Sequence, residues 1–78
     1  MTEEELLKCV GKNIKKYRMQ KGILQQDLAA ICNMEIPNMS RIENGRTNPT
    51  LKTLLKISSS LGVEIVDLLE PECKEPEK

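Results

Sequence analysis

Residues 25–44 read QQDLAAICNMEIPNMSRIEN. The apolar residues of this stretch recur at helical spacing on both sides of Asn33, and asparagine is the residue that, after glycine, best tolerates a left-handed turn. The first of the two predicted helices runs from about residue 25 to residue 32. The residues that we expect it to bury are Leu28, Ala29, Ile31 and Cys32. Two short helices separated by one turn residue predict a helix-turn-helix.

The second helix of this pair is predicted from about Ile36 to Asn44. Pro37 lies in its first turn, where a missing N–H costs little. Met39 and Ile42 are expected to point inward with Met34, and the Asn-Gly pair at residues 44–45 ends the helix.

A longer helix is predicted upstream, from about Glu4 to Lys21, ending at Gly22. Its apolar stripe is formed by Leu6, Val10, Ile14 and Tyr17. Lysines occupy the opposite face, at positions 8, 12, 15 and 16. Because charges opposite an apolar stripe are typical of any surface helix, we interpret this basic stripe as a solvated face and leave it outside the candidate site.

Downstream, Thr50 after Pro49 predicts the start of a fourth helix that runs to Leu61 and stops at Gly62. The residues expected on its buried side are Leu51, Leu54, Leu55, Ile57 and Leu61. A short fifth helix is predicted over residues 65–69. The fold class is therefore all-α, with a single domain over residues 1–70 and a flexible acidic, proline-containing tail over residues 71–78.

Composition narrows the function. The chain has 12 Lys+Arg and 12 Asp+Glu, so its net charge is zero, but the charges are segregated along it. Tyr17 is the single aromatic residue, which disfavours the base-stacking platforms of single-strand binders and favours duplex as any nucleic-acid partner. There is no histidine, no plausible nucleophile–base pair and no glycine-rich phosphate loop, so an enzyme is not expected.

Metals, cofactors and membranes are not expected either. The three cysteines lack CxxC spacing and no histidine accompanies them, which does not fit the usual zinc sites. An odd cysteine count, with no signal peptide and no long apolar run, favours a reducing, cytoplasmic compartment. With no second domain, a small-molecule ligand is not expected.

The run GILQQDLAAICNMEIPNMSRIENGRTNPTLKTLLKISSSLGVEIVDLL resembles the lambda-repressor-like domains of the Cro and phage-repressor (XRE) family of bacterial DNA-binding regulators. The resemblance spans roughly residues 9–69 and implies a five-helix bundle whose third helix lies in the major groove of B-DNA. The positions that match the family's base-contacting residues are Ile36, Pro37 and Arg41. Those that match phosphate-contacting residues are Gln25, Asn38, Asn44, Arg46, Thr47 and Asn48, together with the backbone amides of residues 44–47.

Three further expectations follow from the resemblance. Arg18 and Glu43 match a pair that forms an internal salt bridge between the first and third helices. Leu24 stands where a capping Ser or Thr is usual, and Glu35 replaces a common cap of the third helix. The position of Val66 is commonly polar, so Ile65, Val66 and Leu69 are hypothesised to form an apolar homodimer interface.

Together these observations predict a sequence-specific regulator of double-stranded DNA, most simply a dimeric repressor on a palindromic operator. Two other interpretations remain open. One is an antitoxin-type or other protein-interaction module in which DNA binding is secondary, which co-purification of a partner would reveal. The other is a degenerate helix-turn-helix that only oligomerises, which a gel shift against genomic fragments would separate.

Overall fold

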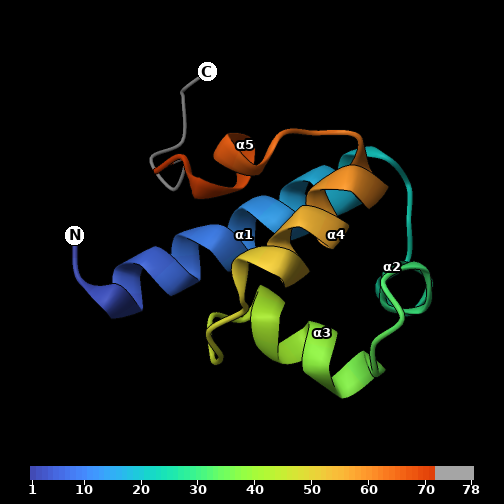
Figure 1. The fold of residues 1–78 in the computed structure, drawn as a ribbon, viewed down its shortest axis with the longest axis horizontal. Helices are drawn as coiled ribbons and strands as arrows, with labels where there is room; N and C mark the ends of the chain where they lie inside the picture. The colour runs from blue at the N-terminus through green and yellow to red at the C-terminus, as the bar shows by residue number, and fades with distance from the viewer. Residues whose placement is uncertain (72–78) are drawn as a thin grey trace.

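The computed structural model describes residues 1–71, which form five α-helices and no strand (Figure 1). The helices are α1 (Glu3–Gln20), α2 (Gln25–Ile31), α3 (Ile36–Glu43), α4 (Leu51–Leu61) and α5 (Ile65–Leu69). The predicted all-α class is confirmed, and each predicted boundary lies within one residue of the observed one. The predicted tail, residues 71–78, falls outside the described residues from position 72 onward.

Capping groups explain where the two longest helices begin. At α1, the Thr2 hydroxyl accepts from the Glu5 amide at 3.1 Å while the Glu5 carboxylate accepts from the Thr2 amide at 2.9 Å. At α4, the Thr50 hydroxyl accepts from the Thr53 amide at 3.1 Å. Each bond satisfies a backbone donor that the first helical turn leaves without an intrahelical partner. By contrast α2 begins without a side-chain cap, as Leu24 predicted, and the Glu35 side chain makes no cap hydrogen bond at the start of α3.

The five helices share one core. α1 packs against α3, α4 and α5, while α2 lies against α3 and α4 (Figure 1). The buried cluster consists of Val10, Ile14, Leu28, Ala29, Cys32, Met39, Ile42, Leu54, Ile57, Leu61 and Leu68. Tyr17 and Met34 are partly buried at its edge. α3 therefore packs against both α1 and α2, and one face of α3 points away from the core.

Four apolar residues expected in the core lie largely at the surface instead. Ile31 is 60% exposed, Leu51 71%, Leu55 55% and Leu6 38%. In α2 the buried residues occupy one side, and Ile31 projects about 110° away from it at 100° per residue. Leu55 is similarly displaced from the buried face of α4, where Ser58 is buried and donates to the Leu55 carbonyl at 3.1 Å. Leu6 and Leu51 lie in the first turns of their helices.

A buried asparagine that the sequence did not point to joins α1 to α5. Asn13 is 1% exposed, and its side-chain amide donates to the carbonyls of Leu68 at 2.9 Å and Glu70 at 2.8 Å. These are carbonyls that the end of α5 leaves without intrahelical donors. Asn13, on α1, therefore caps the C-terminal end of α5.

Two glycines let the end of α3 lie directly on α1. A Cβ built on Gly11 would overlap the backbone carbonyl of Glu43 and lie 2.6 Å from the carbonyl oxygen of Ile42. A Cβ on Gly45, whose φ is +70°, would lie 2.8 Å from the Cα of Lys8. Both approaches are closer than a side chain permits, so α3 takes its position because these residues have none.

Candidate nucleic-acid interface

The connection between α2 and α3 is a tight turn centred on Asn33. Asn33 has a φ of +57°, the left-handed conformation that its residue type predicted. The backbone N–H of Asn33 donates to the Ala30 carbonyl at 3.0 Å, and the backbone N–H of Met34 donates to the Ala29 carbonyl at 2.9 Å. Because Ala29 is fully buried and small, α3 can pack across α2 at this point. The two helices and their turn form a helix-turn-helix unit.

α3 has a buried face and an exposed face, and the proposed base-contacting residues are exposed. Met39, Ile42 and Glu43 are buried, whereas Pro37 and Arg41 lie on the opposite side and Ile36 is 48% exposed. The exposed face therefore carries one apolar side chain, Pro37, and one guanidinium, while Ile36 lies at its edge in the first turn of α3. Within residues 1–71 the Arg41 side chain makes no hydrogen bond or ion pair, so its guanidinium can extend toward a base edge.

An ion pair fixes the exposed face of α3 relative to α1. Arg18 Nε donates to Glu43 Oε2 at 2.7 Å and Arg18 Nη2 donates to Glu43 Oε1 at 3.1 Å, a bidentate pair. Arg18 Nη1 also donates to the Ile23 carbonyl at 3.0 Å. The side chains are 11% and 3% exposed, so water screens the pair poorly. The geometry links α1, the loop before α2, and α3.

Gln25 joins this network. Its side-chain amide donates to Glu43 Oε1 at 3.1 Å, and the residue is half-buried at the start of α2. The resemblance assigned Gln25 to a phosphate. In the structure the same side chain also holds α2 against the end of α3, so a phosphate contact would have to use its second amide hydrogen.

The turn that follows α3 corrects one expectation. The amides of Asn44, Gly45 and Arg46 were expected to be available to phosphate, but they donate to the carbonyls of Ser40 at 3.0 Å, Ile42 at 3.1 Å and Arg41 at 2.9 Å. The physical reason is that the C-terminal end of a helix leaves carbonyls without partners, and the amides that follow turn back to satisfy them. Residues 44–46 can therefore contact phosphate only through side chains, whereas the Thr47 amide makes no backbone hydrogen bond within residues 1–71.

The side chains of this turn are placed to reach outward. Asn44, Arg46 and Asn48 are exposed and Thr47 is half-buried. The side-chain amide of Asn44 donates weakly to the Ser40 hydroxyl at 3.5 Å. Asn38, another candidate phosphate contact, is half-buried on α3 with its amide 3.8 Å from the Met34 sulfur.

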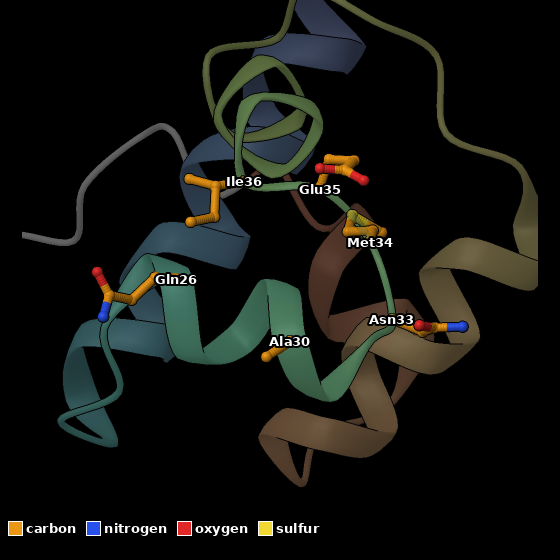
Figure 2. A pocket seen from close by; sticks show the side chains of 6 residues that line it. All are labelled: Gln26, Ala30, Asn33, Met34, Glu35 and Ile36. Carbon is orange, nitrogen blue, oxygen red and sulfur yellow. The ribbon is translucent and has the colours of Figure 1, made fainter.

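A hollow of about 330 Å³ opens between α2 and the start of α3. Gln26 and Ala30 line it from α2, and residues 33–36 line it from the turn and α3 (Figure 2). Sequence reasoning did not single out Gln26, yet its exposed amide borders the same hollow as Ile36. Its position one residue after Gln25 was the available signal.

A second hollow, of about 250 Å³, lies where α1 meets the end of α3. Its lining residues are Lys8, Lys12, Lys15, Glu43 and Asn44. The sequence alone predicts that the basic stripe of α1 is a solvated face outside the candidate site. The structure brings three of its four lysines beside Asn44.

The hypothesised dimer residues lie on α5. Val66 is 60% exposed, Leu69 38% exposed and Ile65 half-buried. Leu69 also lines a mostly apolar hollow of about 240 Å³ with Leu6 and Leu51, two of the exposed residues described above. An apolar surface therefore extends from α5 across the first turns of α1 and α4.

Within residues 1–71, no helix is long and apolar enough to cross a membrane. The same part of the chain contains no group of three or more Cys, Asp or Glu residues placed to hold a metal ion.

Curated relatives are similar to this sequence along most of its length. The chain is 35% identical over 72 residues to the uncharacterized HTH-type transcriptional regulator y4dJ of Sinorhizobium fredii, covering 92% of this chain and 94% of the relative. It is 37% identical over 57 residues to the HTH-type transcriptional regulator DdrOP3 of Deinococcus deserti. That match covers 73% of this chain but spans only 44% of the length of DdrOP3.

Solved structures share the fold. The hypothetical transcription factor NHTF from Neisseria superposes with a TM-score of 0.84 at 30% identity, covering 95% of this chain and 85% of NHTF. The restriction-modification controller protein C.Esp1396I gives a TM-score of 0.78 at 35% identity, covering 92% of this chain and 96% of that protein. The helix-turn-helix family HTH_3 matches residues 14–68, and this chain therefore belongs to that family of DNA-binding transcriptional regulators.

Proposed function

We propose that this protein binds double-stranded DNA sequence-specifically, with α3 in the major groove, and acts as a dimeric transcriptional repressor. The observation that carries the proposal is the orientation of α3. Its buried Met39 and Ile42 and the Arg18–Glu43 pair hold it in place, while Pro37 and Arg41 face outward. A helix docked in this way presents its outward side chains to base edges.

Each exposed residue of α3 has a distinct chemical role in this proposal. The Arg41 guanidinium can donate two parallel hydrogen bonds to guanine O6 and N7, a contact worth about 1–3 kcal/mol of discrimination against other bases. Ile36 and Pro37 offer only apolar contact, which suits a thymine methyl group. Sequence reading is therefore assigned mainly to Arg41.

Phosphate contacts are assigned to side chains on both flanks of α3. Asn44, Arg46, Thr47 and Asn48 follow the helix, Gln25 lies before it at the start of α2, and Asn38 lies on α3 itself. Such contacts fix the orientation of the protein on the duplex without specifying sequence. This division predicts that the two kinds of residue respond differently to mutation.

Dimerisation, location and the lack of catalysis belong to the same proposal. A dimer formed through Ile65, Val66 and Leu69 would place two α3 helices on a palindromic operator and block transcription there. The similarity to a restriction-modification controller protein over 96% of its length supports a regulator built on this domain. A regulator of bacterial DNA works in the cytoplasm, and nothing in its proposed action requires a catalytic step.

The test is selection of bound duplexes from a random pool, followed by binding measurements with Arg41→Ala and Arg46→Ala at several salt concentrations. Arg41→Ala is expected to lose preference at one base position, by about 1–3 kcal/mol, because a bidentate reader is removed. Arg46→Ala is expected to weaken binding to all sequences alike and to lower the salt slope by about 1.

If Arg41→Ala kept the wild-type preference at every position, α3 would not read sequence in this way. If the wild-type protein selected no duplex, the function itself would be wrong.

A further inference from the structure

The basic stripe of α1 borders the proposed DNA surface, which gives it a function that its sequence alone does not indicate. We infer that Lys8, Lys12 and Lys15, named here the lysine ridge, bind phosphates of the DNA strand that passes the end of α3. This inference rests on the proposed DNA binding and extends its footprint from the helix-turn-helix onto α1.

Continuity with the proposed phosphate contacts is the first argument. Because Gly11 and Gly45 bring the end of α3 onto α1, the lysine ridge and Asn44 line the same hollow of about 250 Å³. A strand whose phosphate meets the Asn44 side chain therefore passes next to the ridge. No rearrangement of the helices is needed for both to contact one strand.

The charge of the hollow is the second argument. All three ridge lysines are exposed. Glu43 also lines the hollow, but its carboxylate is occupied by Arg18 at 2.7 Å and by Gln25 at 3.1 Å. Lys8 approaches Glu4 at 4.0 Å, where both side chains are more than half exposed, and such a pair is worth little. The hollow is thus positively charged overall.

The spacing of the ridge is the third argument. Lysines at positions i, i+4 and i+7 lie along one side of a helix, and at 1.5 Å per residue they span about 10 Å. Each DNA strand is a row of closely spaced negative charges, so a row of lysines of this length can meet more than one phosphate of the same strand. A line of three cations fits a strand better than a single small anion.

A purely structural role is the competing explanation. The C-terminal end of α3 carries partial negative charge, which nearby lysines would stabilise. That role would affect the unfolding of the protein. It would leave the salt dependence of DNA binding unchanged.

The experiment compares two double variants of the whole chain that lose the same charge. Lys12→Gln/Lys15→Gln removes two ridge lysines, and Lys21→Gln/Lys56→Gln removes two exposed lysines at the far end of α1 and on α4. Both are titrated with the duplex selected by the wild-type protein between 50 and 300 mM salt. Thermal unfolding is measured in parallel.

The ridge variant is expected to bind about tenfold or more weakly at low salt, with a salt slope shallower by about 2 and unchanged base preference and melting temperature. The control variant should keep the wild-type slope. An unchanged slope in the ridge variant, with or without a lower melting temperature, would overturn the inference while leaving the function intact. Failure of the wild-type protein to select any duplex would overturn the function, and the inference with it.

Discussion

At the scale of single residues, Glu43 combines two demands that conflict. It lies at the end of the helix proposed to meet DNA, where a free carboxylate would repel phosphate, and its side chain is only 3% exposed. Arg18 resolves both problems by pairing with it in bidentate geometry, and Gln25 adds a third hydrogen bond. Burial of the pair keeps the negative charge away from the surface.

This pairing predicts a non-additive response to mutation. Arg18→Leu should reduce the free energy of unfolding by about 3 kcal/mol, because it leaves the Glu43 carboxylate buried without a cation. The double variant Arg18→Leu/Glu43→Leu should recover most of that loss, less the contribution of the Arg18 bond to the Ile23 carbonyl. Urea unfolding at a fixed protein concentration measures both. Equal losses in the single and double variants would show that the pair is solvated rather than buried.

At the scale of elements, the position of α3 depends on its contact with α1 at Gly11. Gly11 lies inside a helix, where glycine is normally about 0.5–1 kcal/mol less favourable than alanine. Its presence is explained by the carbonyls of Ile42 and Glu43, which occupy the space that a Cβ would need. The helix loses some intrinsic stability and gains the close approach of α3.

Gly11→Ala should therefore destabilise the protein by about 3 kcal/mol, despite its favourable helix propensity, because backbone atoms of α3 cannot move aside as a flexible side chain would. Gly22→Ala is the matched control. It has a φ of +68° with no atom within 4 Å of the added Cβ, so it should lose only about 1–2 kcal/mol of backbone strain. Chemical denaturation of the two variants gives the comparison. A stabilised Gly11→Ala protein would contradict the close approach.

The sequence was enough to predict where each helix begins and ends, but not which face of every helix is buried. Thr50, Asn33 and Gly62 are local signals, and the helices begin, turn and end where these residues predict. The buried face of a seven-residue helix is a different matter. With apolar residues on more than one side of α2, only the neighbouring helices decide that Leu28 is covered and Ile31 is not.

The candidate site divides in the same way. Asn13 and Gly11 act through partners far along the chain, so neither hydropathy nor spacing could show their roles. The proximity of the lysine ridge to Asn44 is likewise a product of packing between α1 and α3. The prediction that the amides after α3 are available to phosphate was wrong for residues 44–46. These amides donate to carbonyls at the end of the helix that they follow.

At the scale of the whole molecule, two surfaces of the bundle differ in charge and polarity. The lysine ridge, Arg41 and Arg46 lie on α1, on α3 and just after α3, whereas α5 and its flanks carry Glu64, Asp67 and Glu70 beside the exposed Val66. The acidic residues of the second set would repel phosphate, and the exposed Val66 among them is the side chain proposed to contact protein. A net charge of zero is thus compatible with one surface for DNA and another for a second copy of the chain.

If Val66 lies in a homodimer interface, Val66→Glu should shift the protein to a monomer, because symmetry would bring two carboxylates together in an apolar contact. Sedimentation velocity at high micromolar concentration tests this, with Lys56→Glu on α4 as a control that adds the same residue outside the interface.

The loss of the dimer should also change which DNA the protein prefers. A dimer spaces two α3 helices about 34 Å apart, so the wild-type protein should prefer a palindrome over a single half-site, and Val66→Glu should lose that preference while still binding the half-site weakly. A wild-type protein that sediments as a monomer, or a Val66→Glu variant that remains dimeric, would place the interface elsewhere.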